Sequence, residues 1–192
     1  MRVIAGRLRG RRIEAPRGDH VRPTYDRVRE SLFSIIGLRV REASVLDLFA
    51  GSGSLGIESL SRGASSVTFV EQDPRVRGIL VRNVEGLGLG GDAAIVGGDA
   101  LRLLERGLPG APFDLVFVDP PYASGLAEAT LERLVPARDL VPGGLVVVEH
   151  AAGQEPAAGG AVHCIRRVRY GTIAVSFFEE SDSSDRQDKE DP

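Results

Sequence analysis

The sequence predicts an α/β fold in which a doubly wound, mainly parallel sheet carries helices on both faces. From residue 44 onward, short apolar segments rich in β-branched residues alternate with segments of helical length. Segments that are apolar throughout are typical of strands buried on both faces, as in parallel sheets. With 42% apolar residues, a chain of 192 residues can form one such domain with short appendages.

The expected elements follow one another regularly. Asp73 is expected to cap the second helix of the series, with Pro74 at its first position. Residues 163–169 and 172–178 predict an antiparallel hairpin at the sheet edge. The other expected strands are 45–49, 67–71, 94–96, 115–118 and 145–149, and the expected helices are 54–61, 74–87, 100–106 and 124–135.

The N-terminal residues predict a small hairpin followed by a helix. Residues 2–4 and 11–13 flank a turn with two glycines, which predicts the hairpin. Thr24 is expected as the N-cap of the helix and Gly37 as its end. The apolar residues at helical spacing, expected to be buried, are Val28, Leu32, Ile35 and Ile36. Arg22, Arg27 and Arg29 are expected near its start or on its exposed flank.

Charge is distributed unevenly along the chain, whose net charge is −3. Residues 1–41 hold eleven arginines and four acidic residues, whereas residues 179–192 hold seven acidic and two basic residues. A basic segment on an acidic body is typical of a surface that binds a polyanion, although a solvated basic surface gives the same pattern. The polar, acidic end of the chain predicts a disordered tail.

A glycine-rich turn follows the first strand. Gly51, Gly53 and Gly56 satisfy the pattern G-x-G-x-x-G, and Glu71 lies 20 residues after Gly51 at the end of the next strand. This pattern is shared by dinucleotide-binding proteins and does not by itself separate a nicotinamide cofactor from S-adenosylmethionine. Asp47 favours S-adenosylmethionine, because a carboxylate there would repel a pyrophosphate but suits an ammonium and a sulfonium.

Two further acidic residues are expected to hold an adenosine group. Glu71 can accept hydrogen bonds from both ribose hydroxyls. Asp99, after the third strand, is placed either to meet the adenine amino group or to cap the following helix. The candidate residues for binding S-adenosylmethionine are Asp47, Phe49, Ala50, Gly51, Gly53, Glu71, Gln72, Asp99 and Ala100.

The fourth strand ends in the most specific motif of the chain. Asp119, Pro120, Pro121 and Tyr122 are the candidate catalytic residues. The Asp119 carboxylate and the Pro120 carbonyl could accept hydrogen bonds from a conjugated exocyclic amine and orient it toward a methyl donor. The prolines would stiffen the turn, and Tyr122 offers a face for stacking on a base that has left its own stack.

Several other kinds of site are not expected. Cys164 is the single cysteine, so no intrachain disulfide can form. His20, His150 and His163 lack the spacing of metal ligands, and no metal site is expected. No apolar run reaches the length of a membrane span, and no secretory signal is seen, which predicts a cytoplasmic protein without a membrane partner.

With these motifs, the sequence resembles the bacterial small-subunit ribosomal RNA guanine-N2 methyltransferases of the RsmD type. The resemblance implies a Rossmann-like class I fold, S-adenosylmethionine as cofactor, guanine N2 as target and the assembling small subunit as partner. The resemblance covers nearly residues 1–178. The expected domains are an RNA-binding extension (1–41) and a methyltransferase domain (42–178), followed by an acidic disordered tail (179–192) that lies outside the resemblance. The motifs that carry it are Arg2–Gly6, Arg9–Arg11, Arg22–Thr24, Asp26–Glu30, Leu46–Gly53, Asp119–Tyr122 and Arg169–Gly171. The candidate RNA contacts are Arg7, Arg9, Arg11, Arg12, Arg22, Thr24, Arg27 and Arg29.

Other functions remain open from the sequence. A DNA adenine-N6 methyltransferase would use the same Asp119–Tyr122 motif, since adenine also carries a conjugated amine. A nicotinamide-dependent oxidoreductase would use the glycine pattern but gives Asp47 and Asp119 no role. An RNA-binding module without activity would leave the cofactor loop unused. A monomer is expected, because no exposed apolar stripe requires a partner.

Overall fold

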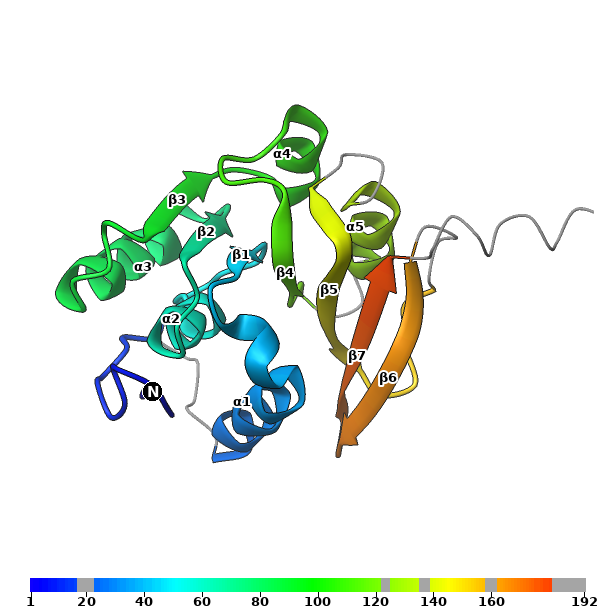
Figure 1. Cartoon of the computed structure of the whole chain (residues 1–192), viewed down its shortest axis with the longest axis horizontal. Helices are drawn as coiled ribbons and strands as arrows, with labels where there is room; N and C mark the ends of the chain where they lie inside the picture. Colours follow the sequence, from blue (N-terminus) through cyan, green and yellow to red (C-terminus); the bar gives the residue numbers. More distant parts are fainter. Residues whose placement is uncertain (17–22, 122–124, 135–138, 158–161, 181–192) are drawn as a thin grey trace, which may run out of the picture.

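The computed structural model describes residues 1–16, 23–121, 125–134, 139–157 and 162–180. Its elements alternate along the chain as the sequence predicts (Figure 1). The helices are α1 (Pro23–Ile36), the 3-10 helix η1 (Gly37–Val40), α2 (Ser54–Ser61), α3 (Pro74–Gly86), α4 (Ala100–Arg106) and α5 (Leu126–Leu134). The strands are β1 (Ser44–Asp47), β2 (Ser66–Glu71), β3 (Ala93–Gly97), β4 (Phe113–Val118), β5 (Leu140–Ala151), β6 (Val162–Tyr170) and β7 (Ile173–Glu180).

The strands form one sheet in the order β3-β2-β1-β4-β5-β7-β6. The first five are parallel, with Val45 of β1 opposite Val67 of β2 and Leu115 of β4. β7 runs antiparallel to β5, and β6 runs antiparallel to β7 at the edge. The order reverses between β1 and β4, and ligands of doubly wound sheets bind outside the carboxyl ends of strands at such a point.

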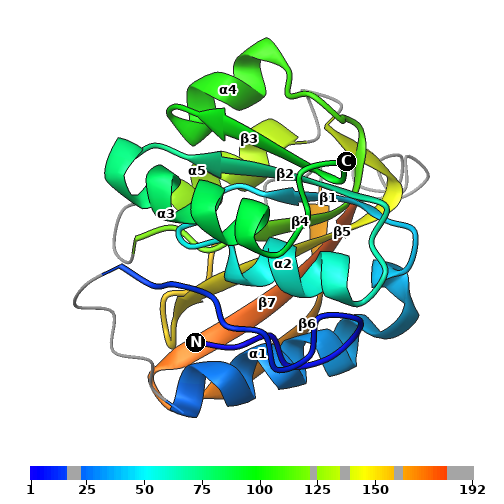
Figure 2. The same ribbon diagram turned by 90° about the vertical axis from the view of Figure 1, so that its left-hand side faces the viewer.

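Helices cover both faces of the sheet (Figure 2). Alternate residues of each central strand point to opposite faces. Val45 and Phe117 belong to the core shared with α1, α2 and α3, whereas Leu46 and Val116 belong to the core shared with α4 and α5. The expected mainly parallel, doubly wound sheet with an antiparallel edge hairpin is therefore confirmed.

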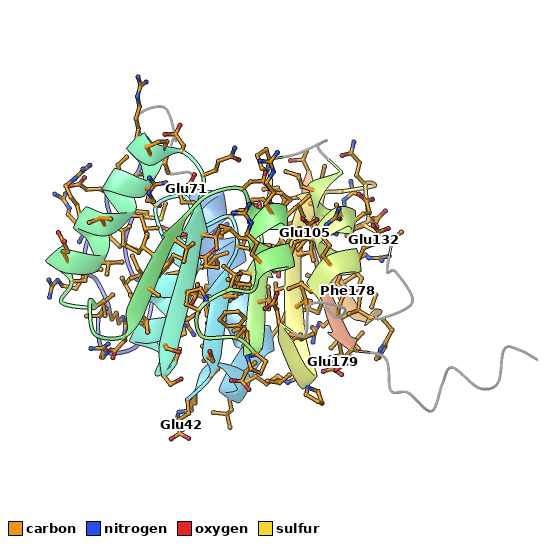
Figure 3. The ribbon with its side chains drawn as sticks, turned by 90° about the horizontal axis from the view of Figure 1, so that it is seen from above. Glu42, Glu71, Glu105, Glu132, Phe178 and Glu179 are labelled. Atoms are coloured by element: carbon orange, nitrogen blue, oxygen red, sulfur yellow. The ribbon has the colours of Figure 1, made fainter. Side chains whose placement is uncertain are left out.

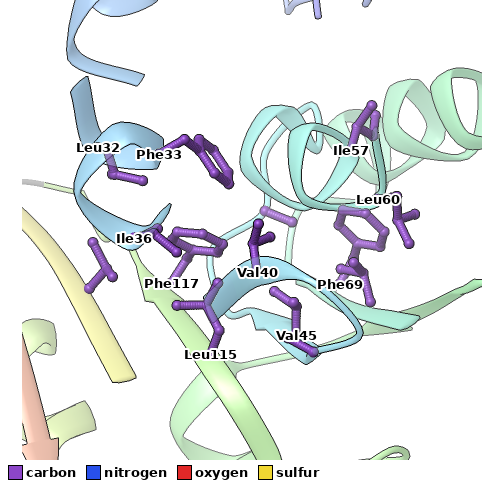
Figure 4. Packing of buried hydrophobic residues seen from close by; sticks show 14 of the residues in the cluster. Leu32, Phe33, Ile36, Val40, Val45, Ile57, Leu60, Phe69, Leu115 and Phe117 are labelled. Carbon is purple, nitrogen blue, oxygen red and sulfur yellow. The ribbon is translucent and has the colours of Figure 1, made fainter. Parts of the chain in front are cut away.

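Aromatic packing fixes α1 against the sheet (Figure 4). The rings of Phe33 in α1 and Phe117 in β4 lie 5.7 Å apart at an angle of 52°. The guanidinium carbon of Arg62 lies over the Phe33 ring, 4.7 Å from the ring centre. Such tilted ring pairs and cation–π contacts add to the burial of apolar area. Since Phe117 lies two positions before Asp119, this packing ties α1 to the strand that carries the expected catalytic motif.

The N-terminal residues form a loop closed by one antiparallel bridge, between Arg2 and Arg12. The expected hairpin is thus present only as this bridge and a few backbone hydrogen bonds, because the loop pairs mainly with α2. Glu58 of α2, fully buried, accepts hydrogen bonds from the backbone of Ile4 and Ala5. A side chain at Gly6 would collide with the α2 backbone, so the close approach requires glycine there.

Most expected boundaries agree with the structure within a few residues. Asp73 caps α3 by accepting hydrogen bonds from the backbone of Arg75 and Val76. Gly37, with φ +59°, follows the end of α1 as expected. The expectation that Thr24 precedes this helix is wrong: α1 begins at Pro23, a residue well suited to a first turn because it has no N–H to satisfy.

Some expectations concern residues outside the described part of the chain. Arg22, Tyr122 and the tail from residue 181 onward lie there, and the side chain of Thr24 is also not described. Their predicted roles remain predictions.

Replacing Phe33 with Ala should lower the free energy of unfolding by about 3–5 kcal/mol, the usual cost of removing a fully buried Phe. Urea unfolding followed by circular dichroism measures this loss. Leu38→Ala is the matched control, because the Leu38 side chain is 76% exposed on the adjacent 3-10 helix. Equal losses for the two variants would contradict the described packing of α1.

Candidate active site

A cavity of about 760 Å³ lies along the carboxyl edge of β1, β2, β4 and β5. In Figure 3 Glu71 marks this edge at the end of β2, whereas Glu42 lies at the opposite edge of the sheet. Parallel strands bring their carboxyl ends to one edge, so residues far apart in sequence meet there. The candidate residues that line the cavity are Phe49, Ala50, Gly51, Glu71, Gln72, Asp99, Ala100, Asp119, Pro120 and Pro121.

The turn after β1 brings backbone to the cavity wall. Gly51 and Gly53 have φ values of +55° and +86°, which glycine adopts without strain. The Ala50 amide donates to the Val70 carbonyl at 2.9 Å and fixes the turn against β2. A Cβ at Gly51 would meet no protein atom within 4 Å, so the wall leaves space there for a ligand.

Asp47 lies behind this turn, and neither it nor Gly53 belongs to the cavity lining. The Asp47 carboxylate accepts a hydrogen bond from the Gly56 amide at 3.0 Å and so holds the start of α2. Burial raises the pKa of Asp47 from 3.8 to about 7; the Gly56 hydrogen bond opposes this rise and the charge of Glu71 adds to it. Asp47 therefore lies outside the cavity lining and fixes the turn that borders the cavity.

Two carboxylates at the β2–β3 side are fixed by backbone hydrogen bonds. Glu71 accepts from the Gly51 amide at 2.9 Å and from the Asp73 amide at 2.8 Å, one bond on each oxygen. Each oxygen keeps a lone pair for a ribose hydroxyl. Asp99 caps α4 by accepting from the Arg102 amide at 3.0 Å and also lines the cavity. Its two expected roles are therefore compatible.

Asp119 follows the end of β4 and lines the cavity, to which it is exposed. Burial raises its pKa well above the ordinary range, and the negative charges of Glu149 and Asp47 raise it further. Pro120 is buried and Pro121 exposed, and both line the cavity next to Asp119. A cationic group bound nearby would favour the ionised form of Asp119.

Helix α1 closes the cavity, with Asp26, Val28, Arg29 and Leu32 in its wall. The expectation that Arg29 lies on the exposed flank of the helix is wrong, since this side chain is only 6% exposed. Its guanidinium turns inward because it bonds the Arg2 carbonyl at 2.6 Å and the Asp26 carboxylate at 3.0 Å.

The remaining described arginines of the candidate RNA surface are exposed. Arg7 pairs with Asp92 at 3.2 Å, and Arg11 donates to the Gly86 carbonyl at 3.1 Å. Arg9 and Arg12 belong to the same N-terminal loop, and Arg27 lies on α1. The structure thus keeps five of the predicted side chains at the surface: Arg7, Arg9, Arg11, Arg12 and Arg27.

The sequence reasoning missed part of the cavity wall. Glu149 lines it at the end of the apolar run of β5, and an acidic residue after a buried strand is the signal that identified Asp119. Asp26 and Leu32 of α1 carry no such signal, because their place depends on how α1 packs on the sheet. Ser54 and Leu55, at the start of α2, follow directly from the glycine turn.

No group of three His, Cys, Asp or Glu side chains suited to a metal occurs within the described ranges. Among the helices of those ranges, none is long and apolar enough to cross a membrane.

The residues present fit S-adenosylmethionine. Carboxylates at Glu71 and Asp99 can accept hydrogen bonds from ribose and adenine, the turn at Gly51 leaves room for the ligand, and buried negative charge suits a sulfonium. This site and the seven-stranded sheet define the class of protein: a Rossmann-like class I methyltransferase.

Comparison with known proteins identifies the group within this class. Residues 1–179 match the family model described as conserved hypothetical protein 95. The ribosomal RNA small subunit methyltransferase D of Escherichia coli is 41% identical over 149 residues, which cover 78% of this chain and 74% of that protein. The chain belongs to this family, the RsmD family.

Comparison with solved structures agrees with this family assignment. The Escherichia coli protein yhhF superimposes with a TM-score of 0.83 at 36% identity, covering 94% of this chain and 98% of that one. An RNA methyltransferase from Salinibacter ruber, solved with S-adenosyl-L-homocysteine, gives a TM-score of 0.60 at 17% identity, covering 81% and 92%. That second likeness concerns the fold alone.

Asp47→Asn should stabilise the ligand-free protein at pH 8. A buried carboxyl whose folded pKa is raised to about 7 favours folding only while protonated, so its contribution is lost as pH rises from about 4 to 7. Asn keeps an oxygen for the Gly56 amide, and the gain at pH 8 should be on the order of 2–4 kcal/mol. Chemical unfolding at pH 4 and pH 8 measures it.

The same substitution should weaken S-adenosylmethionine binding, because it removes a buried negative charge near the ligand. Unfolding curves of wild type and Asp47→Asn that differ by the same amount at both pH values would contradict the raised pKa. Asp92→Asn, which makes the same replacement at a half-exposed surface carboxylate, is the control.

Proposed function

We propose that the protein transfers a methyl group from S-adenosylmethionine to the exocyclic N2 of a guanine in small-subunit ribosomal RNA. The observation that carries the proposal is that Asp119, Pro120 and Pro121 share one cavity with the cofactor turn at Gly51. Membership of the RsmD family supports a ribosomal RNA methyltransferase that depends on S-adenosylmethionine. Neither observation selects guanine N2, which rests on the resemblance.

The candidate cofactor-binding residues form two groups, one for the adenosine and one for the methionine part of S-adenosylmethionine. Glu71 and Gln72 after β2, with Asp99 and Ala100 at the start of α4, would hold the adenosine. The turn at Gly51 would hold the methionine part beside α1. In this orientation the sulfonium would lie between the two groups, in the cavity that Asp119 also lines.

Bound S-adenosylmethionine supplies an electrophilic methyl group on a sulfonium. The protein has to present the N2 lone pair in line with it. Hydrogen bonds from the amine to the Asp119 carboxylate and the Pro120 carbonyl would hold nitrogen in that position and stabilise its developing positive charge. The new N–C bond forms as the C–S bond breaks, and the surplus proton of N2 passes to Asp119 or to solvent.

The base has to leave its stack to reach Asp119 in this cavity. The candidate residue for stacking on it, Tyr122, lies outside the described part of the chain. Exposed arginines of the N-terminal loop and α1 would bind phosphates around the entrance and supply affinity without reading sequence. In this proposal residues 1–41 form the RNA-binding extension and residues 42–178 the methyltransferase domain. The predicted start of the tail at residue 179 is wrong, because β7 continues to Glu180; the acidic segment from residue 181 onward lies outside the described residues. The enzyme acts in the cytoplasm as a monomer on the assembling small subunit.

Asp119→Ala should abolish methyl transfer and leave cofactor affinity within about threefold, since Asp119 contacts the base and only its charge reaches the cofactor. Tritiated S-adenosylmethionine is incubated with small subunits that lack base methylation, and the RNA is digested to nucleosides. Wild type should place label in N2-methylguanosine. Asp114→Ala is the control, because Asp114 lies at the opposite end of β4 and bonds the Ser44 amide.

Other outcomes of this assay would revise the proposal. Label in a different nucleoside would keep the methyltransferase and reject guanine N2. Transfer to duplex DNA as N6-methyladenine, with none to RNA, would establish the DNA alternative. An Asp119→Ala variant with full activity would refute the role given to the motif.

Arg9→Glu combined with Arg12→Glu should weaken RNA binding and flatten its dependence on salt. Each lost phosphate contact lowers the slope of log K against log salt by about 0.7–0.9. Fluorescence anisotropy with a ribosomal RNA fragment at several salt concentrations measures both effects. Arg102→Glu combined with Arg106→Glu, at exposed positions of α4 outside residues 1–41, changes the charge by the same amount and should leave the slope unchanged. Identical slopes for all variants would remove the N-terminal loop from the RNA-binding surface.

A further inference from the structure

Arg29 is a cation placed inside the cavity wall. Its side chain is 6% exposed, and burial lowers its pKa while the charges of Glu58 and Asp26 act in the opposite direction. A buried guanidinium requires partners for its charge and for its N–H groups. Asp26, which itself is 43% exposed, supplies the ion pair.

The hydrogen bonding of this guanidinium is incomplete. One terminal nitrogen, Nη2, donates to the Arg2 carbonyl and to Asp26. The other, Nη1, reaches only the sulfur of Met1 at 3.2 Å, and a thioether is a weak acceptor. Nε is buried without a hydrogen-bond partner. Two of the three guanidinium nitrogens, Nη1 and Nε, therefore lack a strong acceptor among the described residues.

The charge of the cavity wall indicates which kind of acceptor would suit the Arg29 guanidinium. Carboxylates predominate, at Asp26, Glu71, Asp99, Asp119 and Glu149, and they suit the sulfonium and ammonium of S-adenosylmethionine. Among the described side chains of the lining, only Arg29 is cationic. The methionine carboxylate of the cofactor is an anion that needs such a group.

The position of Arg29 agrees with the direction of the cofactor. Glu71 and Asp99 mark the adenosine end on the β2–β3 side. The glycine turn and the first residues of α2, Ser54 and Leu55, line the cavity together with Arg29 of α1. An extended cofactor anchored by its ribose at Glu71 therefore brings its methionine part to the α1 wall.

We propose that Arg29 binds the methionine carboxylate of S-adenosylmethionine and is thereby a cofactor-positioning residue. The guanidinium completes its donor set on this carboxylate while Asp26 and the Arg2 carbonyl hold it in place. Through Arg2 the N-terminal loop supports the cofactor site as well as the proposed RNA surface. The inference concerns the cofactor and holds whichever base is methylated.

The test compares two ligands that differ in one group. Isothermal titration calorimetry without RNA measures the affinities of S-adenosylmethionine and of its decarboxylated analogue, which keeps the sulfonium and the amine. Wild type should prefer S-adenosylmethionine by about 10- to 100-fold, the range expected for a charged hydrogen-bonded contact. In Arg29→Gln the two ligands should bind equally within about threefold.

Two further variants keep the test decisive. Arg62→Gln removes a neighbouring arginine that bonds Glu58 and stacks on Phe33 but does not line the cavity, so it should keep the wild-type preference. Arg29→Lys keeps the buried charge and should fold even if Arg29→Gln does not, with a reduced preference because the planar fork is lost.

A purely structural role of Arg29 would give a different pattern. Arg29→Gln would then weaken both ligands by the same factor and keep their ratio, which would overturn the proposal. An unchanged ratio in Arg29→Lys, or a wild-type protein that does not distinguish the ligands, would overturn it as well. Since the assay contains no RNA, an error about the methylated base cannot affect its result.

Discussion

The parallel pairing of β1, β2, β4 and β5 places four carboxyl groups at one edge of the sheet. Asp47, Glu71, Asp119 and Glu149 each lie at or near the end of one of these strands, and hydrogen bonding of the backbone fixes their separation. Burial and mutual repulsion raise the pKa of Asp47 and of Asp119. Keeping these groups ionised costs the ligand-free protein free energy, and a cation bound near them would offset that cost.

The N-terminal segment completes this site as part of the same core. Val3, Leu8 and Ile13 pack in one cluster with residues of α1, α2 and the sheet. Glu58 joins the two parts, since its buried carboxylate bonds two backbone amides of the N-terminal loop and also Arg62. A segment whose composition indicates a basic arm for RNA therefore also builds the wall that faces the cofactor.

Periodicity and local chemistry predict those parts of the structure that depend on neighbours in sequence. The strand positions, the cap at Asp73 and the turn at Gly51 belong to this group, because backbone geometry and burial decide them locally. The burial of Arg29 and Glu58 cannot be predicted in this way, because a charged residue on a helix is expected to be exposed unless its partners, distant in sequence, are known. The place of Glu149 in the cavity wall can be predicted from sequence, because an acidic residue at the end of a buried strand also identified Asp119. The place of Asp26 cannot be predicted in this way, because it depends on how α1 packs on the sheet through Phe33 and Phe117.

The hydroxyl pair between Ser31 and Tyr170 joins residues 139 positions apart. It joins α1 to β6, the strand at the edge of the sheet. Contacts of such long range slow folding, because the intervening chain must be ordered before they form. The position of α1, and with it the part of the cavity wall that α1 forms, thus depends partly on an edge hairpin whose described residues line no part of the cavity.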